Sequence, residues 1–322
     1  METRKLGKTD LTVSRICFGT MTFGSQMDEA TAHRTLDYCV DRGINFIDTA
    51  NVYNKGVSET ITGNWLKTNR NKVVLATKVR GKMGEGKLEQ GLAKAAILKA
   101  VDESLTRLQT DRIDLYYLHL PDYEVPVEES LEAMESLVKA GKVRYPASSN
   151  YSGWQVTEML CLAGNRHWTP ATVTQPMYNL LARGIEQEYL PMCRHFGIAT
   201  CVYNPVAGGL LTAKHRREQP QAGTRFDNNQ MYLDRYWHPA YFDAVERLSQ
   251  IAVDARRSLV SLALNWLLHH TPVDCVILGA SRLEQLEQNL ATLADGPVTQ
   301  SVLDACDEVW RNLRGVTPKY NR

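Results

Sequence analysis

Four side chains that could together move a proton stand at or near the ends of short apolar segments. Asp48, Lys78 and His119 each end such a segment, and Tyr53 lies five residues after Asp48. The hydroxyl of tyrosine has a reference pKa of about 10, but a nearby lysine ammonium favours the phenolate and lowers that pKa. We expect Asp48 to keep Lys78 charged and His119 to donate a hydrogen bond to a substrate oxygen. The four residue types therefore suit the protonation of a carbonyl oxygen.

Each of these residues also has an ordinary structural role when it is considered alone. A lysine at a strand end is usually solvated, the pair Asp48-Thr49 is typical of a turn, and a histidine that closes an apolar strand is usually a core group. The functional interpretation therefore depends on the occurrence of all four together at successive strand ends.

The elements that must position them are short apolar segments alternating with longer helical patterns. Helical spacing extends over residues 93–108 and 131–140, and Gly43 and Gly141 are typical stop signals. The eight apolar segments are residues 15–18, 45–48, 73–78, 113–119, 143–145, 172–175, 199–203 and 275–278. Strands that are each followed by a helix predict an α/β protein with a (β/α)8 barrel, because parallel strands need covered crossovers. A doubly wound open sheet is the alternative.

In such a barrel, neighbouring strands lie ~4.8 Å apart and the chemistry gathers at their C-terminal ends. Asp48, Lys78 and His119 then end the second, third and fourth strands, so their side chains can converge with Tyr53 on one spot.

Two segments fall outside the repeat. Residues 2–13 alternate polar and apolar around residues 7–10, which predicts a small hairpin that plugs the N-terminal end of the barrel. Residues 204–240 form the longest irregular stretch and follow the seventh strand, where barrel sites are commonly completed. We expect one domain over residues 1–322, with extra helices at its C-terminal end.

Composition limits the class of protein. The chain has 322 residues, 43% hydrophobic and 23% charged, and a formal net charge of +1, so no global field favours nucleic acid or an acidic membrane. The N-terminal residues 1–5 lack the apolar core of a secretory signal, and no apolar run approaches the ~20 residues needed to span a bilayer. We therefore expect a cytoplasmic protein.

Cysteine and histidine spacing gives no sign of a disulfide framework or a metal site. The seven cysteines are widely spread without a C-x-x-C pair, and the eight histidines form no H-x-H or H-E-x-x-H motif. The one adjacent pair, His269-His270, ends a helical pattern. A metal-dependent barrel hydrolase is therefore disfavoured.

At residues 45–53, with Ser58-Glu59-Thr60, the chain resembles the aldo-keto reductase superfamily, as it does at residues 73–78 and 114–119. The similarity continues in family order through residues 141–145, 149–150, 175–179, 203–212, 277–282 and 283–289. Within the superfamily, the stretches 204–205, 235–237 and 283–289 are most similar to the aflatoxin-aldehyde and succinic-semialdehyde reductase branch. The resemblance implies a TIM barrel that reduces an aldehyde or ketone to an alcohol with NADPH.

By the same resemblance, Tyr53 is the general acid, Lys78 lowers its pKa, Asp48 bridges to Lys78, and His119 orients the carbonyl of a small-molecule substrate. All four family positions carry the expected residue. A cofactor-binding regulatory subunit resembling the potassium-channel β subunits is the alternative, because those subunits also retain the four residues. Neither the physiological substrate nor the oligomeric state follows from the sequence.

The resemblance implies a nicotinamide cofactor bound without a Rossmann domain, and no G-x-G-x-x-G motif occurs. Residues 81–87 do fit G-x-x-x-x-G-K, but Leu88 follows where a phosphate-binding loop has Ser or Thr. We interpret this segment as a flexible loop at the barrel rim.

Strand ends and one helix start are the expected cofactor contacts. The amides and hydroxyl of Ser149, Asn150 and Gln175 suit the carboxamide, with loop capping as the alternative, and Tyr203 suits stacking on the nicotinamide, with barrel packing as the alternative. Gly208, Gly209 and Lys214 suit the pyrophosphate, although glycines in a loop are often only turns. The full set is Gly19, Thr20, Met21, Asp48, Ser149, Asn150, Gln175, Tyr203, Asn204, Pro205, Val206, Ala207, Gly208, Leu210, Lys214, Arg225, Gly279, Ser281, Arg282, Gln285 and Asn289.

The helix start at residues 279–282 bears on the choice between NADP and NAD. A helix N-terminus with Ser281 and Arg282 suits the 2′-phosphate of NADP, and Gln285 and Asn289 lie on the same predicted face, within reach of an adenine. An ordinary N-cap with a surface arginine is the alternative.

Residues 225–232 and 235–238 mix aromatic rings with arginines, which suits a partly apolar substrate with an anionic tail. The alternative is that Arg225 binds the cofactor and Trp237 only anchors the loop. Two positions depart from the family pattern: Pro146 interrupts the fifth strand, and Ala213 replaces a common glycine. Both departures put the detailed geometry of cofactor binding in question.

Overall fold

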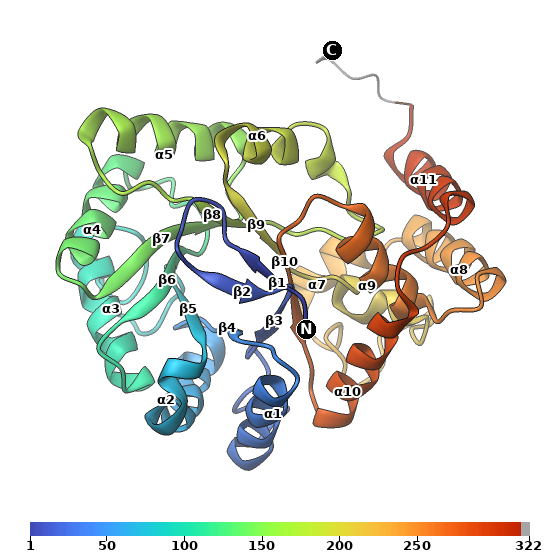
Figure 1. Cartoon of the computed structure of the whole chain (residues 1–322), viewed down its shortest axis with the longest axis horizontal. Helices are drawn as coiled ribbons and strands as arrows, with labels where there is room; N and C mark the ends of the chain where they lie inside the picture. Colours follow the sequence, from blue (N-terminus) through green and yellow to red (C-terminus); the bar gives the residue numbers. More distant parts are fainter. Residues whose placement is uncertain (317–322) are drawn as a thin grey trace. The chain divides into compact units, whose positions relative to one another are not determined.

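The computed structural model describes residues 1–316, and within them eight strands close a barrel in the order β10-β3-β4-β5-β6-β7-β8-β9 (Figure 1). The strands are β3 (Ile16–Gly19), β4 (Phe46–Asp48), β5 (Val74–Val79), β6 (Ile113–Leu118), β7 (Val143–Ser149), β8 (Val173–Gln175), β9 (Ala199–Val202) and β10 (Cys275–Gly279). Neighbouring strands run parallel in each pair from β10–β3 through β8–β9. The predicted (β/α)8 barrel is confirmed, and closure excludes the open sheet.

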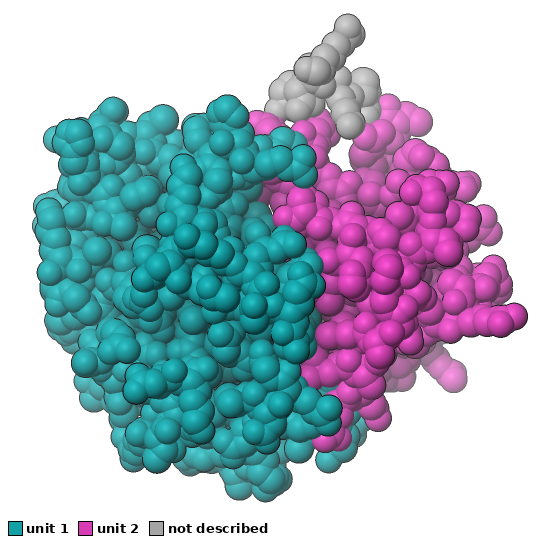
Figure 2. Space-filling model, viewed as in Figure 1, with its two compact units in different colours: residues 1–176, 191–201, 274–286 teal, residues 177–190, 202–273, 287–322 magenta. Residues whose placement is uncertain are grey.

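The described residues form two compact units, coloured separately in Figure 2. Unit 1 comprises residues 1–176, 191–201 and 274–286, and so contains the barrel except the last residue of β9. Unit 2 comprises residues 177–190, 202–273 and the chain from residue 287 onward. The expectation of a single domain over residues 1–322 stays a prediction.

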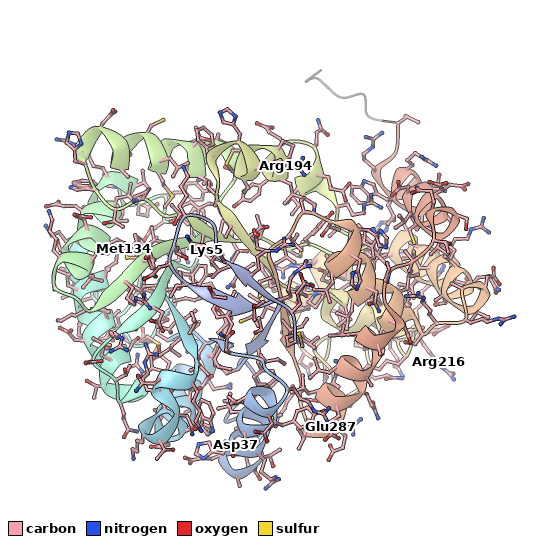
Figure 3. All side chains as sticks on the ribbon, viewed as in Figure 1. Lys5, Asp37, Met134, Arg194, Arg216 and Glu287 are labelled. Atoms are coloured by element: carbon pink, nitrogen blue, oxygen red, sulfur yellow. The ribbon has the colours of Figure 1, made fainter. Side chains whose placement is uncertain are left out.

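The helices of unit 1 are α1 (Glu29–Asp41), α2 (Val57–Asn69), α3 (Lys94–Leu108), α4 (Val127–Lys139) and α5 (Gly153–Arg166), with α6 (Tyr189–Phe196) beginning in unit 2. Short 3-10 turns η1 (Tyr53–Gly56) and η2 (Arg70–Lys72) flank α2. Helix α1 begins at a side-chain cap: Asp28 accepts a hydrogen bond from the backbone N–H of Thr31 at 2.8 Å. Asp37 of α1, labelled in Figure 3, accepts a hydrogen bond from the indole of Trp65 on α2 at 2.7 Å.

The predicted N-terminal hairpin is confirmed, with β1 (Thr3–Lys5) antiparallel to β2 (Thr12–Ser14). Its tip meets the N-terminal ends of β8 and β9. Gly7 has φ +51°, and a Cβ there would stand 3.0 Å from the carbonyl oxygen of Gly197 and 3.1 Å from the amide of Ala199, so only glycine fits. Arg144 on β7 donates to both carboxylate oxygens of Asp10, at 2.8 and 2.9 Å. The hairpin therefore packs on the N-terminal end of the barrel, as expected.

Strand β7 extends beyond the predicted residues 143–145. It runs to Ser149, and Pro146 lies inside it opposite Tyr116. The register continues through Ala147 and Ser148 after the proline, so the strand tolerates one missing donor without a bulge.

Unit 2 is built from helices and loops. It contains η3 (Gly184–Glu186), η4 (Ala207–Thr212), α7 (Gln230–Tyr236), α8 (Pro239–Asp254), α9 (Leu259–His270), η5 (Thr292–Asp295) and α11 (Gln300–Arg314), while α10 (Leu283–Ala291) begins in unit 1. The stretch 204–240, expected to be irregular, contains η4 and α7. Helix α11 is an extra C-terminal helix, as predicted.

Buried Arg183 connects three parts of unit 2. Its guanidinium pairs with Glu186 at 2.7 Å and with Asp307 of α11 at 2.8 Å. It also lies 5.0 Å from the ring centre of Trp266 on α9. These contacts hold α9, α11 and the η3 turn together. No helix among residues 1–316 is long and apolar enough to cross a membrane.

Candidate active site

The four residues singled out at the strand ends all lie in unit 1 and converge on the buried ammonium of Lys78. Its Nζ donates to Asp48 Oδ1 and, at 2.7 Å, to the backbone oxygen of Thr49. The hydroxyl of Tyr53 lies 3.4 Å from the same nitrogen. Asp48 ends β4 and Lys78 is the fifth residue of β5, so the register of these two adjacent strands sets the contact.

The loop that carries Tyr53 is fixed by hydroxyl groups. Ser58 Oγ donates to the backbone oxygen of Thr20 at 2.8 Å and lies 3.0 Å from the hydroxyl of Thr49. Asn54 adopts φ +49° and its side-chain amide donates to the backbone oxygen of Phe23 at 2.6 Å. These bonds tie the segment directly after Tyr53 to the residues that follow β3 and β4.

Electrostatics keep Lys78 charged although it is fully buried. Burial by itself lowers the pKa of Lys78, but the charge of Asp48 and then the hydroxyl of Tyr53 outweigh it, so the net pKa is raised. A permanent ammonium beside a phenol hydroxyl stabilises the phenolate. The pair therefore suits release of a proton from Tyr53.

His119 follows β6, and its backbone N–H donates to the carbonyl of Val79 at 3.0 Å. Its ring meets the ring of Tyr53 edge-on, with centres 6.0 Å apart and an interplanar angle of 81°. Burial, then the charges of Lys78 and Arg80, lower the pKa of His119 to about 3. The imidazole is neutral near pH 7 and can donate one hydrogen bond without carrying a charge.

Gln175, expected to contact a cofactor carboxamide, reaches the carboxylate of Asp48. Its Nε2 donates to Asp48 Oδ2 at 3.0 Å, so both oxygens of Asp48 have partners. Ser149 Oγ donates to the backbone oxygen of Gln175 at 2.9 Å, and Asn150 Nδ2 donates to that of His119 at 2.9 Å. Sequence reasoning missed the Gln175–Asp48 contact, although a polar residue at the end of β8 was its signal.

At the end of β3, the expected contacts Gly19, Thr20 and Met21 differ in accessibility. A Cβ on Gly19 would stand 3.0 Å from a side-chain methyl of Ile277. Thr20 is buried, and its amide donates to the backbone oxygen of Asp48 at 2.9 Å, whereas Met21 is 37% exposed. Gly19 and Thr20 are buried, so of these three residues only Met21 exposes a side chain to a ligand.

The start of α10 shows local capping and one exposed cation. The backbone amide and the hydroxyl of Ser281 donate to Gln285 Oε1, at 3.0 and 3.1 Å. These bonds fit the alternative in which the start of the helix is an ordinary N-cap. Arg282 is exposed and has no ion-pair partner among residues 1–316. Gly279 ends β10. Asn289 lies in unit 2 and is half-buried.

The remaining expected cofactor residues lie in unit 2, in the segment that follows β9. Tyr203 and Val206 are half-buried, Pro205, Ala207 and Leu210 are buried, and Lys214 is exposed. Gly208 and Gly209 have φ of +68° and +108°, and Ala213, in place of a glycine, is held at +57°. Asn204 is 7% exposed, and its Nδ2 has no hydrogen-bond partner within the described chain.

Two arginines of unit 2 stack on one tyrosine. The guanidinium groups of Arg225 and Arg235 each lie 5.5 Å from the ring centre of Tyr232, and neither has an acidic partner among the described residues. The hydroxyl of Tyr232 accepts from Arg225 at 3.2 Å and donates to Asn204 Oδ1 at 3.2 Å. Trp237 packs 5.0 Å from Phe226, consistent with an anchoring role in this loop.

Within residues 1–316, no group of three or more His, Cys, Asp or Glu side chains is arranged to hold a metal ion. All seven cysteines are free, and six of them are buried.

Comparison with known proteins establishes the family. The model of the aldo/keto reductase family matches residues 15–311, so the chain belongs to that family. It is 38% identical to human aldo-keto reductase family 7 member A3, over 94% of this chain and 96% of that protein. It is 39% identical to aflatoxin B1 aldehyde reductase member 2 of Mus musculus, over 94% of this chain and 86% of the relative.

The relatives include a protein of another kind. The chain is 33% identical to a probable voltage-gated potassium channel subunit beta of Arabidopsis thaliana, over 96% of both chains. Family membership supports an oxidoreductase that acts on carbonyl groups.

Proposed function

We propose that this aldo/keto reductase family protein reduces an aldehyde or ketone to an alcohol with NADPH, and that Tyr53 is the general acid. The observation that supports it most directly is the buried, charged ammonium of Lys78, 3.4 Å from the hydroxyl of Tyr53. Burying an ammonium removes it from water and costs solvation free energy, and that cost is offset when the ammonium stabilises another charge. Here the other charge is that of the phenolate that Tyr53 becomes after it gives up its proton.

Each residue has one task in this mechanism. Tyr53 donates its proton to the carbonyl oxygen as that oxygen gains negative charge. Lys78 stabilises the resulting phenolate, and Asp48, itself bonded by Gln175, keeps Lys78 charged and in place. Neutral His119 donates a hydrogen bond to the carbonyl oxygen and sets its angle, but is too weak a base to carry a proton itself near pH 7.

The residues present fit a nicotinamide dinucleotide. Buried Asn204 keeps an unpartnered Nδ2 donor, and Arg282 is an exposed guanidinium without an acidic partner in the described chain. When bound, the reduced nicotinamide supplies a hydride to the carbonyl carbon. Ser149, Asn150 and Asn204 would hold it by hydrogen bonds and Tyr203 by its ring, while Arg282 would bind a 2′-phosphate, which favours NADPH over NADH.

The test is reduction of a panel of simple aldehydes and ketones, followed by the loss of NADPH absorbance, with NADH in parallel. Turnover that depends on both NADPH and the carbonyl compound supports the proposal. Tight binding of NADPH without turnover of any carbonyl in the panel would instead favour the channel-subunit role.

A further inference from the structure

Three buried hydroxyl groups meet where the first turn of α2 contacts the ends of β3 and β4. Thr20 follows β3, Thr49 follows β4 and Ser58 lies in the first turn of α2, and none of the three is exposed to solvent. Ser58 Oγ lies 2.8 Å from Thr20 Oγ1 and 3.0 Å from Thr49 Oγ1. Because a buried hydroxyl is costly unless it is bonded, removing one member of this cluster leaves another without its partner.

The proton positions in this cluster follow from its acceptors. Ser58 has one hydroxyl proton, and the backbone oxygen of Thr20, 2.8 Å away, can only accept it. With that proton committed, Ser58 Oγ accepts from the two threonine hydroxyls. The hydroxyl of Thr49 therefore donates to Ser58.

Thr49 connects this cluster to the ammonium of Lys78. Its backbone oxygen accepts from Lys78 Nζ at 2.7 Å, and its backbone N–H donates to the carbonyl of Ala76 at 2.9 Å. The other two N–H donors of Lys78 are directed to Asp48 Oδ1 and to the hydroxyl of Tyr53. Because the three N–H directions of an ammonium are fixed relative to one another, the Thr49 oxygen helps to set where the third one points.

The contact between Lys78 and Tyr53 is the one most sensitive to this arrangement. Lys78 Nζ and the hydroxyl of Tyr53 are 3.4 Å apart, close to the limit of a hydrogen bond, whereas the carboxylate of Asp48 attracts the ammonium as an opposite charge. A small shift of the ammonium toward Asp48 would break the contact with Tyr53. The carbonyl of Thr49 gives the ammonium a second fixed acceptor and so limits such a shift.

The helix that carries Ser58 is itself held firmly. The neighbouring residue Glu59 is buried, and its carboxylate accepts from Thr77 of β5 at 2.6 Å and from Arg107 of α3 at 2.7 Å. A Cβ on Gly63 of α2 would overlap the backbone of Arg107, so the two helices pack in direct backbone contact. The first turn of α2 is therefore a rigid support for the ends of β3, β4 and β5.

We propose that Ser58 and Thr49 are positioning residues: the hydroxyl bond between them fixes the Thr49 carbonyl, which holds the Lys78 ammonium against the hydroxyl of Tyr53. The inference rests on the proposed reductase function and adds two fully buried residues that act through Lys78. Loss of the hydroxyl bond would let the ammonium settle on Asp48 and weaken its effect on Tyr53. A weaker acid protonates the carbonyl oxygen more slowly, with little change in substrate binding.

The first experiment measures kcat and KM for butanal with NADPH. Thr49→Val removes the hydroxyl and keeps the volume of the side chain, Thr49→Ser keeps the hydroxyl, and Ser58→Ala removes the acceptor. Thr35→Val on α1 is the matched control, because Thr35 is also fully buried and donates to the backbone oxygen of Thr31 at 2.8 Å. We expect kcat to fall about tenfold in Thr49→Val and Ser58→Ala and less than twofold in the other two variants, with KM within about twofold throughout.

A titration of Tyr53 separates positioning from general damage. Phenolate absorbance is followed against pH for each protein and for the same protein carrying Tyr53→Phe, and the difference isolates Tyr53 from the other tyrosines. His119, whose ring meets that of Tyr53, is neutral over this range because its pKa is lowered to about 3. The midpoint of the Tyr53 titration should lie about one pH unit higher in Thr49→Val and Ser58→Ala than in the wild type, and should not move in Thr49→Ser or Thr35→Val.

An unchanged midpoint in Thr49→Val and Ser58→Ala would overturn the positioning role, and so would an equal loss of kcat in Thr49→Ser or Thr35→Val. Ser58→Ala, the smaller change, decides the question if Thr49→Val does not fold. A wild-type protein that reduces no carbonyl compound, but whose Tyr53 midpoint still moves in Ser58→Ala, contradicts the reductase function and supports the positioning of Lys78. The two failures are therefore distinguishable.

Discussion

The Asp48–Lys78 pair of unit 1 and the segment after β9 in unit 2 differ in how fully their polar groups are hydrogen-bonded. In unit 1, both oxygens of Asp48 are bonded, and Lys78 donates to Asp48 and Thr49. In unit 2, Asn204 Nδ2 and both ring nitrogens of buried His215 have no hydrogen-bond partner within residues 1–316. The first arrangement is complete within the protein, whereas the second has unused hydrogen-bonding capacity.

The difference follows from the elements that carry the residues. Strands of a closed barrel hold side chains in fixed register, so a catalytic group can be preorganised by its neighbours. The segment after β9 is a loop, and loops carry ligand-binding groups more often than strands do, so its unpartnered donors suit a ligand that arrives from solution. We therefore expect substitutions at Asp48, Tyr53 and Lys78 to affect the chemical step and those in the segment after β9 to affect binding.

The largest effect should come from Tyr53→Phe, which removes the acid and keeps the ring. Carbonyl reduction should fall by a factor on the order of 10² to 10⁴, with NADPH affinity nearly intact. Single-turnover kinetics measures the rate of carbonyl reduction, and fluorescence titration measures the affinity for NADPH. A variant that keeps more than half of the wild-type rate, when chemistry limits that rate, would show that Tyr53 is not the acid.

Arg282→Ala tests whether the exposed guanidinium at the start of α10 selects the cofactor. A lost charge-assisted contact corresponds to ~1.5 to 3 kcal/mol, or roughly a ten- to hundredfold weaker NADPH complex, while NADH has no phosphate there to lose. Quenching of tryptophan fluorescence by each cofactor is the measurement. Equal losses for the two cofactors would mean that Arg282 acts only on the structure of the helix.

Arg235→Ala tests the substrate hypothesis for unit 2. If Arg235 binds a carboxylate, KM for succinic semialdehyde should rise about three- to tenfold while KM for an uncharged aldehyde of similar length changes little. General damage to the loop would weaken both substrates together.

The smallest effect concerns His215 and pH. Burial, then the charge of Lys214, lower the pKa of folded His215 from 6.5 to about 4. Between these pH values the unfolded chain binds the proton and the folded chain does not, so the free energy of unfolding falls on acidification. Between pH 8 and pH 5, the free energy of unfolding should therefore fall less in His215→Phe than in the wild type, by on the order of 1 kcal/mol.

Urea denaturation at the two pH values measures this difference. His167→Gln, at an exposed histidine, is the matched control, so an altered pH dependence in His215→Phe alone assigns the effect to the buried imidazole. An unchanged pH dependence in His215→Phe would show that the buried imidazole is not the group responsible.

Much of the fold and the four central residues could be predicted because they depend on local pattern. Apolar segments with helices between them predict a barrel, and a barrel brings Asp48, Lys78 and His119 together. The bond from Gln175 to Asp48 joins strands β4 and β8, which are not adjacent, and depends on side-chain reach across the interior. Residue type alone could not distinguish it from a contact to a cofactor.

Other features depend on backbone geometry that residue types do not encode. The positive φ of Arg80 is imposed by its surroundings on a residue that rarely adopts it. Likewise, Pro146 stays inside β7 because its neighbours on β6 maintain the register. Helix α7 was missed because it is only seven residues long and lies within a polar stretch.

The hairpin at the N-terminal end of the barrel has a practical consequence for handling the protein. Met1 is 45% exposed and lies near Gly43, in the turn that leads into β4, while His119 follows the opposite end of β6. An affinity tag or a surface linker fused before Met1 would therefore leave from the end of the barrel away from the reacting groups. Immobilisation through the N-terminus should orient the molecules on a support with their catalytic ends facing the solution.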